Sequence, residues 1–285
     1  MRINTNINSM RTQEYMRQNQ AKMSNAMDRL SSGKRINNAS DDAAGLAIAT
    51  RMKAREGGLN VAGRNTQDGI SLIRTADSAL NSVSNILLRM RDLANQSANG
   101  TNTLGNQASL QKEFSQLKEQ IDYIANNTQF NDQQLLNDNT KTVKIQTLDT
   151  GEGNDTQMTI SLKSVLTNDL KLGSTVKIGD EKNAASTDAA DSADALKAID
   201  AIDTAITTIA GQRATLGATL NRFEFNANNL KSQETSMADS ASQIEDADMA
   251  KEMSEMTKFK ILNEAGISML SQANQTPQMV SKLLQ

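Results

Sequence analysis

The chain lacks cysteine, histidine and tryptophan, and it holds a single proline, Pro277. Without cysteine it can form neither disulfides nor thiolate metal sites. Without histidine it has no Ser-His-Asp or Cys-His nucleophile system and no histidine-ligated zinc. The adjacent carboxylates Asp41 and Asp42 are accounted for as acidic residues at the start of a helix. We therefore expect no enzyme, no metal and no cofactor.

Charge and hydropathy exclude two further classes of partner. The net charge of −3, from 30 basic and 33 acidic residues, leaves no electrostatic footprint for nucleic acid. Residues 1–8 contain no apolar core of a signal peptide, and no apolar run reaches the length of a membrane span. We expect no membrane insertion, and a chain that either stays in the cytoplasm or is exported with its N-terminus uncut.

Aromatic residues make up only 2% of the 285 residues, so aliphatic side chains and alanine must form the core. These residues pack well between helices, and a single proline leaves long helices uninterrupted. The cleanest apolar period runs from about 193 to 244, a helix of roughly 75 Å at 1.5 Å per residue. The sequence predicts a mainly α fold: a long antiparallel helical rod or coiled-coil bundle with discontinuous domains built from both chain ends.

Local signals predict where the earlier helices begin and end. A first helix over 1–30 should end at Gly33, which suits a left-handed C-cap. Ser40 offers an N-cap oxygen to a second helix that runs from Asp41 to about 99. A turn and a third helix follow, and the helical period stops near 126.

Between the third helix and the return helix the pattern changes. Val143 and Ile145 alternate with polar residues, and the alternation resumes from Met158 after a glycine-rich turn, which predicts a small β-hairpin. Residues 173–192 are rich in alanine, aspartate, serine and lysine, which is typical of an exposed loop.

Each end of the chain carries a weak apolar stripe at helical spacing. Helices of such low apolar content are marginal in water, so we expect them to be disordered in the free chain and to order when buried between subunits. The self-assembly residues predicted on this ground are Ile3, Ile7, Met10, Met23, Met27 and Leu30 at the N-terminus, and Met249, Met253, Met256, Phe259, Leu262, Leu270, Leu283 and Leu284 at the C-terminus.

Three stretches resemble one family, the bacterial flagellins. The first runs from Leu30 to Ala49 and reads Ser-Ser-Gly-Lys-Arg-Ile-Asn over 31–37 and Asp-Asp-Ala-Ala-Gly-Leu-Ala-Ile-Ala over 41–49. The others are Thr-Gln-Phe-Asn over 128–131 and Gln-Ala-Asn-Gln-Thr-Pro-Gln over 272–278. The resemblance covers nearly the whole chain, which looks like a short flagellin with almost no variable outer domain.

The resemblance implies a structural subunit that self-assembles into the helical, extracellular flagellar filament used for motility. Copies would meet through heterologous contacts that never close. It implies an inner coiled-coil domain of 1–40 with 246–285. A helical domain with the hairpin, 41–172 with 190–245, would surround it, and a short exposed loop, 173–189, would replace the outer domains.

The resemblance also implies partners. Flagellins pass through a type III export channel without signal cleavage, so we expect the export apparatus, a cytoplasmic chaperone for the C-terminal segment, a filament cap and hook–filament junction proteins. The stretch Arg-Met-Arg-Asp-Leu-Ala over 89–94 resembles the part of flagellin that Toll-like receptor 5 recognises. This implies Arg89, Leu93 and Glu113 as candidate receptor contacts, although Arg89 and Glu113 could equally be solvated helix residues or filament contacts.

Two alternative functions stay open. A hook–filament junction protein shares flagellin-like termini but forms a short adaptor ring, so unlimited growth of a homopolymer separates the two. A non-polymerising coiled-coil binding module would instead show folded, ordered ends in the dilute monomer.

Overall fold

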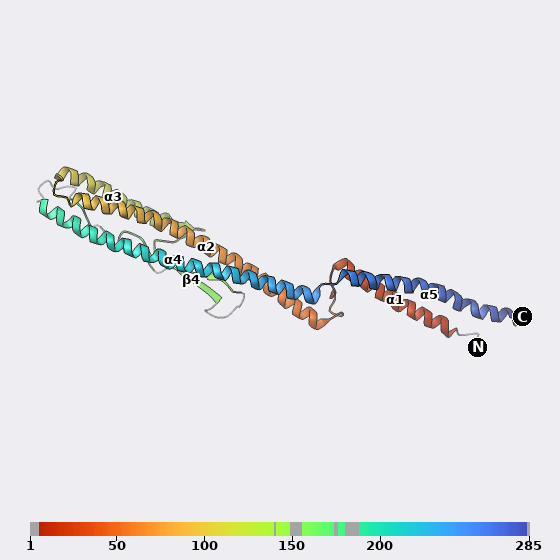
Figure 1. Cartoon of the computed structure of the whole chain (residues 1–285). Helices are drawn as coiled ribbons and strands as arrows, with labels where there is room; N and C mark the ends of the chain where they lie inside the picture. The colour runs from red at the N-terminus through yellow and green to blue at the C-terminus, as the bar shows by residue number, and fades with distance from the viewer. Residues whose placement is uncertain (1–5, 140, 149–155, 174–175, 180–187, 284–285) are drawn as a thin grey trace. The chain divides into compact units, whose positions relative to one another are not determined.

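The computed structural model describes residues 6–139, 141–148, 156–173, 176–179 and 188–283 (Figure 1). These residues form long helices, with short strands between the third and fourth helices, which confirms the mainly α class with a small hairpin. In chain order the elements are α1 (Ile7–Ser32), α2 (Ala43–Ser97), α3 (Leu104–Asn127), β1 (Gln129–Phe130), β2 (Gln133–Gln134), β3 (Thr142–Gln146), β4 (Gln157–Ser161), α4 (Asp188–Glu245) and α5 (Met249–Leu283).

The chain divides into two compact units. Unit 1 combines Met1–Gly57 with Glu234–Gln285, and unit 2 is Gly58–Gln233. Residues 41–57 and 234–245, which the sequence assigns to the helical domain, group here with the terminal helices.

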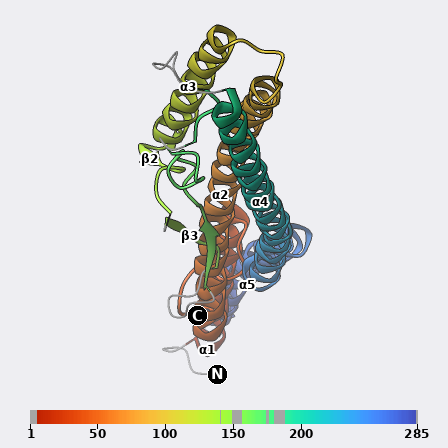
Figure 2. The ribbon, with the colours of Figure 1, turned by 90° about the vertical axis from the view of Figure 1, so that its left-hand side faces the viewer.

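The core of unit 2 is formed by α2, α3 and α4, which run beside one another (Figure 2), and by buried residues of the segment between α3 and α4. On α4 a residue is buried at every seventh position, because a seven-residue repeat keeps one helix face toward its neighbour. The repeat consists of Ile202, Ile209, Leu216, Phe223 and Leu230, each at most 3% exposed. The apolar period predicted for the return helix is therefore its buried face.

The predicted hairpin is present as the antiparallel pair β3–β4. Val143 pairs with Ile160 and Ile145 with Met158, so the alternating apolar residues share one face. The turn predicted between them, at 150–155, lies outside the described residues. A second, very short pair, β1–β2, was not predicted; its turn places Asn131 and Asp132 at positive φ.

The exposed loop predicted at 173–192 is wrong in its described parts. Ile178 is fully buried, and its backbone N–H donates to Oε1 of Gln111 at 2.8 Å. Lys118 Nζ donates to the carbonyl oxygen of Gly173 at 2.6 Å, and burial lowers the pKa of this lysine. From Asp188 the chain is already helical. The polar composition gave no sign of the apolar residues Val176 and Ile178, which pack against the core of unit 2.

Candidate assembly interface

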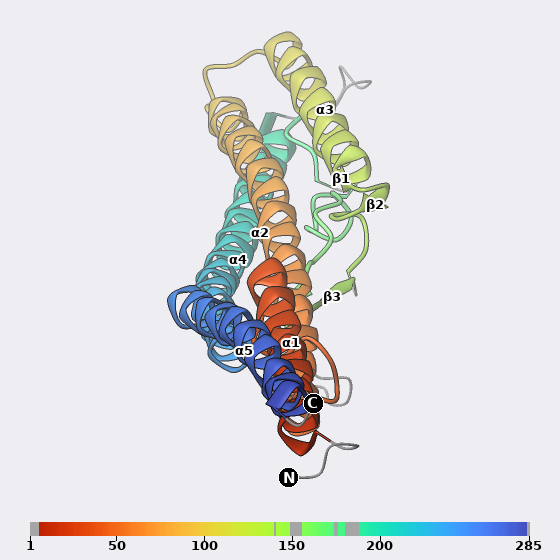
Figure 3. The same ribbon diagram turned by 90° about the vertical axis from the view of Figure 1, so that its right-hand side faces the viewer.

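Unit 1 is built on the pairing of α1 with α5, which lie side by side (Figure 3). Polar contacts among the described residues link the two helices. Asn6 Nδ2 donates to the carbonyl oxygen of Ala273 at 2.9 Å, Asn263 Nδ2 donates to Oε1 of Gln20 at 2.6 Å, and Arg29 Nη1 lies 3.5 Å from Oε1 of Glu252. Residue numbers fall on α5 as they rise on α1, so the pair is antiparallel.

The side chains that α1 and α5 turn toward each other follow a heptad pattern. These buried or half-buried residues, here called the seam, recur at alternating steps of three and four, as in a coiled coil. The seam consists of Ser9, Thr12, Met16, Asn19, Met23, Ala26 and Leu30 on α1, and Glu252, Met256, Phe259, Asn263, Gly266, Leu270 and Ala273 on α5.

Six of these fourteen seam positions are polar residues or glycine, which limits the apolar area that the seam buries. Glu252 is 8% exposed as a side chain, and its Oε2 has no hydrogen-bond partner among the described residues. Leaving a buried polar atom unpaired costs free energy. Close packing is local: a Cβ added at Gly266 would lie 2.8 Å from Cγ of Met16. The two helices fit each other closely at this point, while six seam positions lack the apolar side chains that would stabilise a coiled coil.

The predicted self-assembly residues divide between the seam and the solvent. Met23, Leu30, Met256, Phe259 and Leu270 lie in the seam. The exposed members are Ile7 at 55%, Met10 at 61%, Met27 at 53%, Met249 at 50%, Met253 at 53% and Leu262 at 42%. Ile3 and Leu284 lie outside the described residues, and Leu283 is described only as the last residue of α5.

Sequence reasoning missed the polar and small residues of the seam, such as Ser9, Asn19, Asn263 and Gly266. These residues could have been found from their heptad spacing, but a search for apolar residues alone passes over them. The sequence analysis also treated as one set two kinds of residue that the structure separates. One kind pairs α1 with α5, and the other consists of large apolar side chains exposed to solvent. Exposed apolar surface of this kind marks interaction sites.

A joint connects the terminal helices to α2 and α4. Gly33 ends α1 with φ of 71°, which confirms the predicted left-handed C-cap, and its N–H donates to the carbonyl oxygen of Arg29 at 2.8 Å. Across the joint, Arg35 N–H donates to the carbonyl oxygen of Glu245 at 2.6 Å, and Ala247 N–H donates to that of Gly33 at 3.0 Å. The segments after α1 and before α5 are thus paired backbone to backbone.

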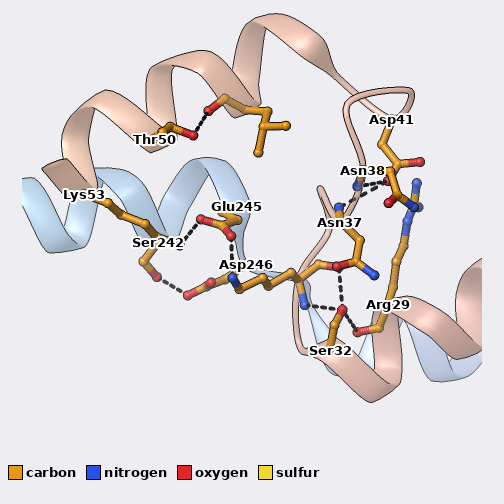
Figure 4. Close-up of polar contacts among 12 residues, drawn as sticks. Arg29, Ser32, Asn37, Asn38, Asp41, Thr50, Lys53, Ser242, Glu245 and Asp246 are labelled. Atoms are coloured by element: carbon orange, nitrogen blue, oxygen red, sulfur yellow. Dashed lines mark hydrogen bonds and ion pairs between the residues drawn. The ribbon is translucent and has the colours of Figure 1, made fainter.

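The side chain of Glu245 strengthens this joint (Figure 4). Its carboxylate is 7% exposed and is held by two lysines from different segments: Lys34 Nζ lies 2.6 Å from Oε1, and Lys53 Nζ contacts Oε2. The hydrogen bonds from Lys34 and then Lys53 lower the pKa of Glu245, and the same contact raises the pKa of Lys34. Charge-assisted bonds of this kind are strong and directional. They therefore hold the segment after α1 and the first part of α2 to the end of α4.

The start of α2 differs from the prediction. Asp42, rather than Ser40, caps the helix: its Oδ1 accepts the N–H of Gly45 at 2.9 Å. Asp41 lies before the helix, and its Oδ2 accepts the N–H groups of Asn37 and Asn38, which lowers its pKa. Both carboxylates therefore have structural roles, which leaves no free acid–base pair in this loop.

The candidate receptor contacts lie in unit 2, and the structure brings two of the three together. Arg89 Nη2 lies 2.8 Å from Oε1 of Glu113, and both side chains are exposed. Leu93 is 1% exposed and belongs to the core. A direct receptor contact through Leu93 is therefore not available in this structure, because the side chain points between the helices.

Neither a candidate metal site nor a candidate membrane span is found among the described residues. In that part of the chain no three acidic, histidine or cysteine side chains gather as a metal site. None of the described helices combines the length and the apolar character that crossing a membrane requires.

Comparisons with known proteins agree with an assembly role. Residues 3–142 match the bacterial flagellin N-terminal helical region, and residues 199–284 match the bacterial flagellin C-terminal helical region. The flagellin of Listeria monocytogenes is 46% identical over all of this chain and 99% of its own length. The flagellin of Bacillus subtilis is 40% identical over the full length of both chains.

Solved structures include similar proteins as well. The crystal structure of Bacillus cereus flagellin is 42% identical and covers 62% of this chain and 94% of its own, with a TM-score of 0.49. A putative flagellar hook-associated protein from Vibrio parahaemolyticus shares the fold at 14% identity, covering 72% of this chain and 100% of its own with a TM-score of 0.59. Nothing in these likenesses favours a junction protein or a binding module. The chain belongs to the bacterial flagellin family, as a short-form structural subunit of the flagellar filament rather than an enzyme.

Proposed function

We propose that α1 and α5 are the polymerisation device of this flagellin, disordered in the free chain and ordered when neighbouring copies cover them. One observation carries the proposal: large apolar side chains of α1 and α5 remain in water although the two helices already pack on each other. Met10 and Met269 are 61% and 64% exposed. Burying such side chains between copies contributes about 1.5–3 kcal/mol each. Because the pairing of α1 with α5 leaves them exposed, this free energy can stabilise the assembly.

Hydrogen exchange on the free chain and on filaments grown from short seeds tests this proposal. Amides of α1 and α5 should exchange rapidly in the free chain and become protected in the filament. Amides around the buried residues of α4, such as Ile209 and Phe223, should be protected in both states and serve as the internal control. Equal protection of α1 and α5 in dilute monomer would favour the coiled-coil binding module instead.

Truncation separates the termini from the rest of the chain. A chain that lacks 246–285 should fail to extend seeds in electron micrographs while it keeps the helical content of unit 2. Normal growth of this truncated chain would contradict the proposal. Growth of the full chain only into short rings would favour a hook–filament junction protein.

Family membership motivates proposals about export and partners. The chain would leave the cell unfolded through the flagellar export apparatus, without cleavage, and would reach the extracellular filament under a cap, with junction proteins at the base. The exposed residues Ile261, Leu262 and Met269 support α5 as the segment that a cytoplasmic chaperone holds. A chaperone complex that survives Leu262→Glu with Met269→Glu would count against this role for α5.

For Toll-like receptor 5 we propose a surface centred on the Arg89–Glu113 ion pair, with Leu93 supporting α2 from the core. Arg89→Ala should reduce receptor signalling by the monomer without lowering its thermal stability, because an exposed ion pair contributes little to folding. Leu93→Ala should reduce both, since it leaves a cavity. An inert wild-type monomer would exclude the receptor as a partner.

A further inference from the structure

Seven of the exposed large apolar side chains of α1 and α5 fall into two groups, defined by their position relative to the seam. Ile7, Met249 and Ile261 belong to neither group. Each member of the first group directly follows a seam residue: Met10, Met27, Met253 and Ile267, which are 53–61% exposed. Each member of the second group directly precedes one: Tyr15, Leu262 and Met269, which are 42–64% exposed.

These two groups lie on opposite sides of the helix pair. One residue turns an α-helix by about 100°, so residues just after and just before the seam point to opposite sides. Because α1 and α5 are antiparallel, equal offsets on the two helices lead to the same side of the pair. The first group therefore forms one side, here called the methionine side, and the second group forms the other, here called the tyrosine side.

We propose that the methionine side of one copy packs on the tyrosine side of the next copy in the filament. The inference rests on the proposed role of α1 and α5 and adds which surfaces meet. Two unlike apolar sides on one subunit are what a heterologous contact requires, and only such a contact continues without closing. A contact of like sides would close as a dimer.

The chemistry of the two sides is complementary. Methionine side chains are unbranched and adapt to irregular surfaces, and a thioether sulfur makes favourable contacts at the edge of an aromatic ring. Tyr15 offers that ring at 61% exposure, and its hydroxyl can stay hydrated at the rim. A second copy of the chain thus supplies what each side lacks.

Because the chain contains no cysteine, engineered disulfides can report this contact without background. Three double variants combine Met27→Cys with Tyr15→Cys, Leu262→Cys or Met269→Cys, which samples three axial offsets between copies. Filaments are grown under reducing conditions, checked by electron microscopy, oxidised and run on denaturing gels. Within one chain each pair lies on opposite sides, so a cross-link reports two copies. At least one double variant should give a ladder of dimers, trimers and longer species.

The controls separate the possible outcomes. Met27→Cys alone should give no dimer, and Asp28→Cys, which is exposed next to Met27, should give no ladder with the same three partners. Dimers from Met27→Cys alone, or filaments in which none of the three double variants gives a ladder, would overturn the inference. Failure of the proposed function is recognised separately, because wild-type α1 and α5 would then exchange equally slowly in free chain and filament.

Discussion

Lys34 Nζ lies 2.6 Å from Oε1 of Glu245, so the segment after α1 is tied by charge to the end of α4. The same Glu245 accepts the N–H of Arg35 through its backbone carbonyl at 2.6 Å. Glu245 thus binds the side chain of Lys34 and the backbone of Arg35, both in the segment that follows α1. These contacts of the joint lie where α1 ends and just before α5 begins.

This contact predicts a pH dependence of the joint. The pKa of Glu245 is lowered from 4.5 by Lys34 and Lys53, so its contribution is complete above the unfolded value and is lost as pH falls through the folded one. The joint should hold at neutral pH and weaken only below about pH 4.5. Carbon-13 titration of the Glu245 carboxyl should give a pKa below 4.5 that moves back toward it in Lys34→Met.

Removing the carboxylate predicts a local effect. Glu245→Gln leaves the backbone pairing intact but removes both ion pairs, so amide exchange at Arg35 and Ala247 should rise by about tenfold. Asp246→Asn, next to it on an exposed side chain, is the matched control and should change exchange at these amides less. Equal effects of the two variants would show that Glu245 has no special role in the joint.

Asp42 as the N-cap of α2 predicts a contrast with Ser40. Asp42→Ala should destabilise the first turn of α2 by about 0.5–2 kcal/mol, because the N–H of Gly45 loses its acceptor. Ser40→Ala should be close to neutral. Hydrogen exchange of the Gly45 and Leu46 amides measures both, and a larger loss in Ser40→Ala would restore the cap expected from the sequence.

Two glycines of α2 predict opposite effects of the same substitution. A Cβ at Gly69 would lie 2.7 Å from Cε1 of the fully buried Phe223, whereas nothing lies within 4 Å of a Cβ at Gly63. Overpacking costs about 1–3 kcal/mol, while alanine gains about 1 kcal/mol over glycine in a helix. Gly69→Ala should therefore lose up to about 2 kcal/mol, and Gly63→Ala should gain up to about 1 kcal/mol, in denaturant unfolding followed by circular dichroism.

The heptads of α2 and α4 and the alternation of β3 and β4 were predictable. Residues on a buried face, such as Ile209 and Phe223, are apolar and recur with the period of their helix or strand. The cap at Asp42 was harder, since three consecutive residues could each cap a helix and only the loop geometry decides among them. The contacts of Val176 and Ile178 with the core were missed because two apolar residues in a polar segment are too few to show a period. The split of the terminal stripes depended on the register of α1 against α5, which polar contacts such as Asn263 with Gln20 set.

Those polar contacts give the last prediction, which concerns order in the free chain. Asn19 and Asn263 occupy seam positions where a coiled coil normally holds aliphatic residues, and polar residues there fix register at a cost in stability. Asn19→Leu with Asn263→Leu should strengthen the seam, so amides of α1 and α5 in the monomer should exchange at least tenfold more slowly. Asn8→Leu, at an exposed position beside Ser9, should leave the exchange unchanged. If the double variant exchanges like the wild type, seam polarity is not what keeps the free ends disordered.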